Sequence, residues 1–501
     1  MRGLVLKRTV TLLLVLLMLL TAAVSCSRTD TSDPSDSSAL STQTNESGSD
    51  DVVETTGETE YVVPDVDLGG RTYTILNCTK DTWKMIGYIT ADEISTDKIS
   101  NEAFARTLWI QQTLNCKIKE VNVGVDSLET EVEKDVMGGG TNTYDAAYQL
   151  ANKLLNGIIA GKYTALDTVE TMNLEADYWM RDLMDSATLN GKTYFAASDL
   201  QLMAFESSRC IYFNTQYFID NKIEAPYALV KSGKWTLEEL MSLSRQAKDL
   251  GNDSSWSFNV EGECVYGFTS FNDCIHALMY GMGMRFTMKD ATDMPYMTCS
   301  SSDFLVKGSK LSEFLDETGT FYYSKSSGSE NGYDRVFMKG RAAMVAVSVR
   351  FAAELRTAGM EFGILPFPKT DSDQTQYHTT VPAKLPVLTI PSSNQSPEEI
   401  GTILDALSYR ANEKMVDLYY RERISLMNNS GDQLNNIDML EIVKSTRSLD
   451  PFISYGIDPD LYNQVIWSMA AGGTDLSSTI TKYKGKGEIV LSELRTFLSV
   501  Q

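Results

Sequence analysis

The sequence predicts an α/β protein with more than one domain and mostly parallel sheets. Short strand-like runs alternate with longer runs of helical periodicity along the body of the chain, as parallel sheets with crossover helices require. The chain has 501 residues, enough for roughly two to four domain-sized cores. Hydrophobic residues make up 43% and aromatic residues 10%, which excludes disorder over the chain as a whole.

The first elements of the body follow one another as strand, helix, strand and helix. Residues 71–76 alternate polar and apolar side chains like a half-buried strand, and 100–114 has a helical period. Lys117–Val123 is strand-like again. Leu128–Met137 is helical and is followed by three glycines, which favour its end there.

Two later helices carry a start signal. Thr236 with Glu239, and Ser396 with Glu399, have the spacing of a capping box, in which two side chains satisfy free backbone N–H groups. A proline follows Ser396 at the first helical position, where its fixed backbone angle suits a helix. We therefore expect helices to begin at both places.

The first 26 residues have the pattern of an export signal. Three basic residues precede an apolar run over 10–20, and small residues then end at Cys26. The run is too short for a transmembrane helix, so it predicts a signal peptide. A cysteine at this place resembles the lipobox of bacterial lipoproteins, which implies lipidation (a palmitate-type anchor) at Cys26 and a site outside the bacterial cell membrane. The alternative is an ordinary secreted protein with an incidental cysteine.

Residues 27–60 consist largely of Ser, Thr, Asp and Glu, with few large apolar side chains. Such a segment buries too little surface to offset its ordering entropy, so we expect a disordered acidic tether. The whole chain has a net charge of −23, of which −18 belongs to residues 61–501. An acidic body is repelled by phosphate backbones, which argues against a nucleic-acid partner.

Cysteine and histidine are both scarce in the body. An even number of exported cysteines permits three disulfides, but six over a body of this size are equally compatible with free buried thiols. Cys264 and Cys274 are the first pair to test. The chain has two histidines, His276 and His378, which disfavours histidine-based metal sites. The six cysteines are Cys78, Cys116, Cys210, Cys264, Cys274 and Cys299.

Six short blocks occur in a fixed order along the body. They are YDAAYQLANKLLNGIIAGKYTALD (144–167), NGKTYFAAS (190–198), IYFNTQYFIDNKIEAP (211–226), KWTLEEL (234–240), FMKGRAAM (337–344) and FGILPFP (362–368). Together, after a lipobox and a tether, this order resembles the extracellular solute-binding proteins of ABC importers. The nearest group is the sugar-binding family 1 that includes maltodextrin-binding protein.

The resemblance implies a periplasmic-binding-protein-like fold: two discontinuous α/β lobes joined by a hinge, with a ligand cleft between them. Lobe 1 would hold 65–197 plus 366–425, and lobe 2 would hold 198–365 plus 426–501. It further implies a monomeric receptor that captures a small solute, expected to be a sugar or oligosaccharide, by hinge closure and delivers it to ABC permease subunits. Neither a cofactor nor catalysis is needed, and the membrane is contacted only through the lipid anchor.

The expected ligand contacts lie on loops, because ligands of α/β sheets bind outside the carboxyl ends of strands. Sugars present apolar faces to aromatic rings and hydroxyls to polar side chains. Arg350 falls near the place where maltodextrin binders carry a stacking Trp, which would suit an anionic or differently shaped ligand. The expected ligand-binding residues are Asp81, Trp83, Tyr148, Gln149, Asn152, Lys153, Glu206, Arg209, Trp256, Asn272, Arg350 and Tyr462.

Other functions stay open at this point. A ferric-ion binder uses neighbouring tyrosines, and the chain has adjacent pairs at Tyr322–Tyr323 and Tyr419–Tyr420. A surface glycan-active enzyme needs two carboxylates across a cleft, and acids are plentiful. A structural adhesin or peptide binder is a third possibility. The chain has no G-x-S-x-G, H-E-x-x-H or P-loop motif, so we assign no catalytic residue and no metal ligand.

Overall fold

The computed structural model describes residues 61–78, 89–90, 96–138, 142–258, 261–324, 328–424, 433–470 and 475–499. All of them belong to one compact unit, Tyr61–Gln501. The predicted signal peptide, Cys26 and the predicted tether lie outside the described residues. Within the described ranges, no helix combines the length and the apolar character that a membrane crossing needs.

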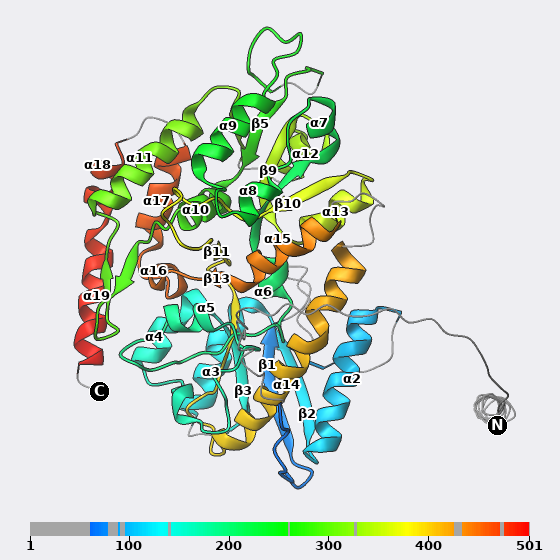
Figure 1. The fold of residues 1–501 in the computed structure, drawn as a ribbon. Helices are drawn as coiled ribbons and strands as arrows, with labels where there is room; N and C mark the ends of the chain where they lie inside the picture. Colours follow the sequence, from blue (N-terminus) through cyan, green and yellow to red (C-terminus); the bar gives the residue numbers. More distant parts are fainter. Residues whose placement is uncertain are drawn as a thin grey trace, which may run out of the picture. The chain divides into compact units, whose positions relative to one another are not determined.

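The first sheet has four strands in the order β12–β3–β1–β2 (Figure 1). β1 is parallel to both β2 and β3, whereas β12 is antiparallel to β3. The long helices α2 and α14 pack side by side on this sheet (Figure 1), and α3 packs against β3. We call this sheet and its helices the first lobe. Its strands are β1 Thr72–Cys78, β2 Lys117–Val123, β3 Ala146–Leu150 and β12 Pro386–Thr389.

The second sheet has five strands in the order β10–β4–β9–β5–β8. β5 is parallel to β8 and β9, whereas β4 is antiparallel to β9 and β10. We call this sheet and its helices the second lobe. Its strands are β4 Arg209–Asn214, β5 Tyr266–Ser270, β8 Phe321–Tyr323, β9 Ala342–Ser348 and β10 Phe362–Leu365.

Both sheets are mixed, but four of their seven strand pairs are parallel, so the prediction of mostly parallel sheets is confirmed, with β4 and β12 as the exceptions. The antiparallel strands β4 and β12 are each the first strand that the chain adds after it leaves the other sheet. Neither is reached through a crossover helix from a neighbour in its own sheet, so the geometry that makes a βαβ unit parallel does not apply.

The helices range from a single turn to six turns. Two small sheets complete the fold: the parallel pair of β11 (Thr379–Thr380) with β13 (Arg447–Ser448), and the hairpin of β6 (Thr287–Lys289) with β7 (Pro295–Met297). The helices are α2 Lys98–Thr113, α3 Leu128–Met137, α4 Leu154–Ile159, α5 Arg181–Ser186, α6 Met203–Glu206, α7 Thr215–Asp220, α8 Tyr227–Lys231, α9 Leu237–Ala247, α10 Asn272–Gly281, α11 Ser302–Asp316, α12 Tyr333–Met338, α13 Phe351–Thr357, α14 Pro397–Tyr419, α15 Gln433–Ser445, α16 Pro451–Ser454, α17 Pro459–Ala470, α18 Leu476–Tyr483 and α19 Gly485–Leu498.

The predicted early elements are confirmed, because β1, α2, β2 and α3 lie within two residues of their expected bounds. α9 and α14 also begin directly after Thr236 and Ser396, but neither side chain makes a capping hydrogen bond. In α14, Glu399 instead accepts hydrogen bonds from Arg71 and Tyr73. Thr236 is part of a β-bridge with Lys369. The predicted start positions of the two helices are confirmed, but the predicted capping-box hydrogen bonds are not formed.

The chain passes between the lobes close to β11. After β10 it stays bonded to the second lobe: Leu237 N donates to Lys369 O at 2.8 Å, and Tyr377 Oη donates to Val230 O at 3.0 Å. Residues 367–377, which follow the crossover predicted near Pro366, are thus still hydrogen-bonded to segments of the second lobe. These bonds hold residues 367–377 in place before the chain enters the first lobe.

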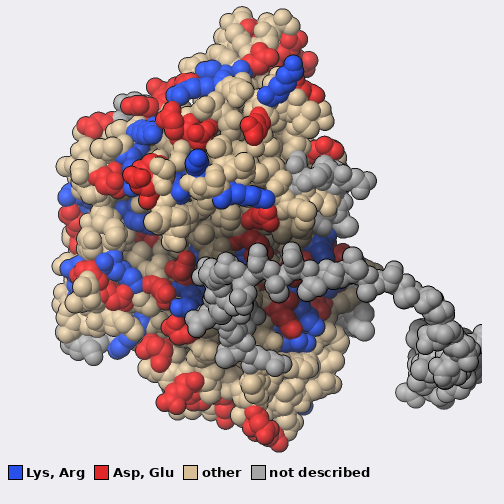
Figure 2. All heavy atoms as spheres, in the orientation of Figure 1, with Lys and Arg blue, Asp and Glu red and all other residues tan. Residues whose placement is uncertain are grey.

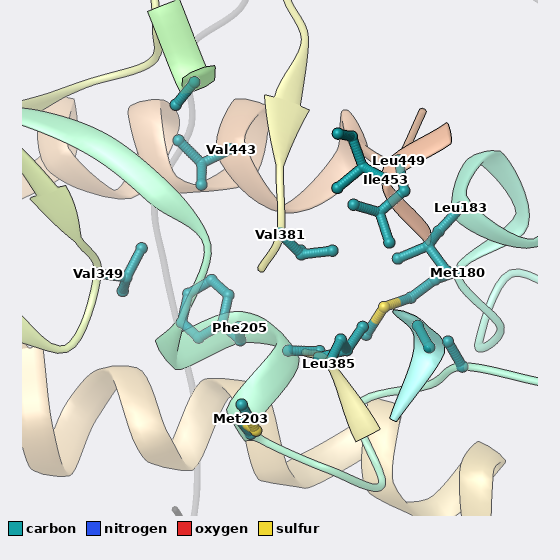
Figure 3. Packing of buried hydrophobic residues seen from close by; sticks show 14 of the residues in the cluster. Met180, Leu183, Met203, Phe205, Val349, Val381, Leu385, Val443, Leu449 and Ile453 are labelled. Carbon is teal, nitrogen blue, oxygen red and sulfur yellow. The ribbon is translucent and has the colours of Figure 1, made fainter. Parts of the chain in front are cut away.

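Buried apolar side chains form one continuous cluster through both lobes. Figure 3 shows the part around α6 and β11, where side chains from distant segments meet. Because the cluster contains residues of both lobes, it packs against the segments that connect them. The labelled members are Met180, Leu183, Met203, Phe205, Val349, Val381, Leu385, Val443, Leu449 and Ile453.

The six body cysteines are all buried and free, including Cys264 and Cys274. Of the two alternatives that the sequence left open, the structure has free thiols. On the face seen in Figure 2, acidic and basic side chains are interspersed rather than separated into regions of one sign.

Candidate functional site

A cavity of about 600 Å³ lies between the two lobes. Asn152, which follows β3, and residues 380–384, which begin at the last residue of β11, line it from the first lobe's side. Residues 206–209 and the segments after β5 and β9 line it from the second lobe. Residues 452–463 complete the wall. A ligand in this cavity would touch segments that belong to both sheets.

The direction of the strands explains why polar side chains gather here. β5 and β9 are parallel, so their carboxyl ends, Ser270 and Ser348, lie at the same edge of the sheet. β4 is antiparallel to β9, which brings its first residue, Arg209, opposite Ser348. The residues that continue from these strand ends form the cavity wall, as expected for an α/β sheet.

An aromatic and ionic layer forms the wall on the side of the second lobe. The ring of Phe271 stacks on Tyr333, with centroids 4.5 Å apart and 13° between the planes. The guanidinium of Arg209 lies over the Phe271 ring, 5.4 Å from its centroid. Arg209 Nη2 also pairs with Asp273 Oδ2 at 3.0 Å. The layer offers a flat apolar surface edged by charged groups.

A buried histidine and a tyrosine lie beside each other at the cavity. The rings of His276 and Tyr462 are 5.1 Å apart in an edge-to-face arrangement. Burial, together with the charges of Arg285 and Arg209, lowers the pKa of His276 to about 3. The imidazole is therefore neutral at neutral pH. Burial likewise raises the pKa of Tyr462, so its hydroxyl keeps its proton.

Asp458 lies at the start of α17, where it is 1% exposed. Its Oδ1 accepts hydrogen bonds from Asp460 N at 3.1 Å and Leu461 N at 3.2 Å. Its Oδ2 is buried and has no hydrogen-bond partner within the described part of the chain. One oxygen of this carboxylate therefore caps the helix, and the other oxygen lacks a hydrogen-bond donor among the described residues.

In the same region, the backbone at Gly456 lies close to the backbone at Asn152. Gly456 has φ +60°, and a Cβ built on it would lie 2.5 Å from Asn152 O. Only glycine accepts both the backbone angle and the contact. Asn152 N donates to Ala383 O at 3.1 Å, while the side-chain Oδ1 of Asn152 lacks a partner among the residues that the structure describes.

The sequence matches no protein-family model, and no curated protein matches it. Solved structures do match over most of the chain. Maltose-binding MalE of Listeria monocytogenes, in complex with maltose, has a TM-score of 0.54 at 13% identity and covers 84% of this chain and 98% of its own. A solute-binding protein of Thermotoga lettingae, bound to α-D-tagatose, has a TM-score of 0.51 at 13% identity over 84% and 100%. UgpB of Mycobacterium tuberculosis, in complex with glycerophosphocholine, has a TM-score of 0.52 at 15% identity over 79% and 95%.

The fold is that of the periplasmic binding proteins. The matched region of MalE and of the Thermotoga lettingae protein covers 84% of this chain, which is enough to include both lobes rather than one. The expected periplasmic-binding-protein-like fold is thereby confirmed, and the cavity occupies the cleft that this fold places between its lobes.

Five of the predicted ligand residues line the cleft of this periplasmic-binding-protein fold: Asn152, Glu206, Arg209, Arg350 and Tyr462. They come from the segments after β3, before β4, after β9 and within α17. Sequence reasoning thus located both walls of the cleft. Asp81 and Trp83 lie outside the described residues.

Five other predicted residues do not line the cleft. Tyr148 and Gln149 are buried inside β3, where the amide of Gln149 donates to Leu128 O at 3.1 Å. They are core residues because β3 is a central strand covered on both faces. Lys153 is exposed. The remaining two are engaged elsewhere: Trp256 packs on Gly319 and Tyr266, and Asn272 accepts a hydrogen bond from Tyr323.

Several cleft residues were missed by the sequence analysis. Phe271 and Asp273 flank Asn272, so the segment was found but the wrong residue was chosen. Asp458 had a readable signal, because an Asp directly before a Pro at a helix start is a typical N-cap pattern. The others, Tyr333, Asp334, Glu354, Lys384 and Phe452, carry no local signal for a site.

The tyrosine pairs considered for ferric ion lie away from the cleft lining. Tyr322 donates its hydroxyl to Asn331 O at 2.9 Å, and Tyr419 is 1% exposed in the core. Over the described residues, no group of three or more His, Cys, Asp or Glu side chains is placed to hold a metal ion. The geometry therefore gives no support to an iron site at these pairs.

Proposed function

We propose that the chain is the solute receptor of an ABC importer and that its solute is a carbohydrate. The observation that carries this proposal is the cleft of about 600 Å³, lined by both lobes of a periplasmic-binding-protein fold. Its volume lies in the range of small-molecule sites. It combines flat aromatic surface, at Phe271 and Tyr333, with many hydrogen-bonding groups, the combination that a sugar requires.

Capture proceeds by hinge closure. A solute that touches Asn152 and residues 380–384 on one side, and Arg209 and Tyr462 on the other, makes all its contacts only when the lobes are together. It therefore stabilises the closed state, whose outer surface the permease subunits recognise. The lobes of this proposal are 65–197 plus 366–425 and 198–365 plus 426–501. Binding needs no cofactor and breaks no bond.

Attachment to the outer side of the cell membrane follows from Cys26 and the tether over 27–60. Replacement of Cys26 by Ser removes the acceptor for the lipid, so the protein should appear in the culture medium instead of the membrane fraction. Retention of the C26S variant in membranes would contradict this part of the proposal while leaving solute binding untouched.

The binding function is tested by a thermal-shift screen of the full chain against mono- and oligosaccharides. A ligand at 100 times its Kd stabilises the folded state by about 2.7 kcal/mol, which a melting curve detects. Ferric ion and glycerophosphocholine belong in the same screen, because one fold neighbour was solved with the latter. Chromatography of the sugars after incubation separates binding from hydrolysis. The absence of any carbohydrate hit, or turnover of a hit, would refute the proposal.

A further inference from the structure

The described residues that line the cleft include more acidic than basic side chains. The carboxylates are those of Glu206, Asp273, Asp334, Glu354 and Asp458, and the cations are Arg209, Arg350 and Lys384. His276 adds no positive charge near neutral pH, since burial lowers its pKa to about 3. One of the three cations, Arg209, is already paired with Asp273. The cleft is therefore poorly suited to an anionic solute, in contrast to what Arg350 alone suggests.

Asp458 is the carboxylate of this set that has a buried oxygen without a partner among the described residues. It is 1% exposed, and in the described part of the chain it forms no ion pair with a Lys or Arg. The helix N-terminus at its Oδ1 supplies about half a positive charge, so a net negative charge is left in a buried place. Buried charges of this kind are ordinarily paired.

A neutral hydrogen-bond donor does not compensate the negative charge of Asp458. A ligand hydroxyl, or the amide nitrogen of Asn152, would satisfy the hydrogen-bonding capacity of Oδ2 but would leave the charge in place. A cation would do both. An aromatic side chain, Tyr462, lines the same cleft one helical turn after Asp458. Its aromatic ring can attract a positive group through its π face.

We propose that the solute carries a protonated amine, which binds Asp458 in the closed cleft, and that the preferred ligand is thus an amino sugar or an oligosaccharide that contains one. This inference rests on the proposed carbohydrate-binding function. Separation of the lobes exposes the buried oxygen to the entering ligand, and closure then holds the ammonium group between Asp458 and the opposite wall at Asn152.

The test compares two trimers with the same backbone by calorimetry on the full chain, at mildly acidic pH. The glucosamine trimer carries ammonium groups, and the N-acetylglucosamine trimer carries neutral acetamides at the same positions. A charge-assisted hydrogen bond is about twice as strong as a neutral one, so the glucosamine trimer should bind about tenfold more tightly. The preference should shrink as salt is added.

Asp458→Asn supplies the matched variant. Asn keeps the acceptor that caps α17, so the fold survives while the charge is lost. The preference for the glucosamine trimer should disappear in D458N. Asp460→Asn is the control, because it removes one charge two residues away: the Asp460 side chain is 75% exposed and Asp460 does not line the cleft. This variant should keep the full preference.

The outcomes separate the two proposals. Equal binding of the trimers, tighter binding of the acetylated trimer, or a preference that survives in D458N would overturn the ammonium site. If neutral sugars bind and the glucosamine trimer does not, the ammonium site is likewise refuted while the carbohydrate receptor stands. If no sugar of any kind binds, the receptor function fails and the ammonium site fails with it.

Discussion

Replacing Arg447 with methionine leaves the carboxylate of Asp199 buried without its partner. These residues form an ion pair between segments that are distant in the sequence: Arg447 lies on β13, and Asp199 lies between α5 and α6. Nη1 and Nη2 of Arg447 donate to the two oxygens of Asp199 at 2.8 and 3.2 Å, and Nε donates to Lys444 O at 2.8 Å. The two side chains are 5% and 3% exposed.

The geometry sets the size of the effect. Two charge-assisted bonds in a dry place contribute about 1.5–3 kcal/mol each, and breaking a buried pair from one side costs about 3–5 kcal/mol. R447M should therefore lower the free energy of unfolding by about 3–5 kcal/mol, measured by urea denaturation of the full chain. The double variant Asp199→Leu with Arg447→Met removes both charges and should recover most of the loss.

The control for this experiment is Arg181→Met. Arg181 pairs with Glu175 at 3.0 Å, but the two side chains are 44% and 82% exposed, so the loss should be below about 1 kcal/mol. Our reasoning is refuted if R447M is no more destabilising than R181M, or if the double variant is as unstable as the single one. A weaker affinity for the solute in R447M, with an intact cleft, would further show that the pair sets the position of the lobes.

Three further predictions concern the cleft. Gly456→Ala should lower the free energy of unfolding by about 1–3 kcal/mol in denaturant titrations, because the new Cβ would lie 2.5 Å from Asn152 O at a residue with a positive φ. Gly340 also has a positive φ but open space around it, so the control variant Gly340→Ala should cost no more than about 1 kcal/mol. Arg350→Ala and Trp83→Ala should each weaken solute binding about tenfold in calorimetry while the melting temperature holds; unchanged affinity in both would remove them from the site. His276→Leu should flatten the dependence of stability on pH: the folded pKa is lowered from 6.5 to about 3, so the unfolded state binds the extra proton and stability falls as pH drops through that window. If wild type and H276L lose stability in parallel between these pH values, the neutral buried His276 is not the cause.

Local patterns predicted the elements well and the contacts between distant elements poorly. Alternation and helical period gave β1, α2, β2 and α3, because these signals depend on neighbours in the sequence. The strand directions of β4 and β12 were missed, since they depend on how the chain passes between two sheets.

The residues of the site show the same difference between local signals, which the sequence carries, and contacts between distant segments, which it does not. Asn152 and Tyr148 are four residues apart and were both expected to contact the ligand, yet one lines the cleft and the other is buried inside β3. The strand ends between them, and only the extent of the strand decides which residue reaches the cleft. Tyr333 and Phe271 are distant in sequence, so their stacking is visible only in three dimensions.

The six buried thiols have a consequence for how the protein folds. Burial raises the pKa of Cys116 to about 11 and those of Cys274 and Cys299 to about 12, so the reactive thiolate form is scarce. Folding then needs no oxidant and no isomerase, and the chain should reach the same native state in a reducing cytosol as in an oxidising medium.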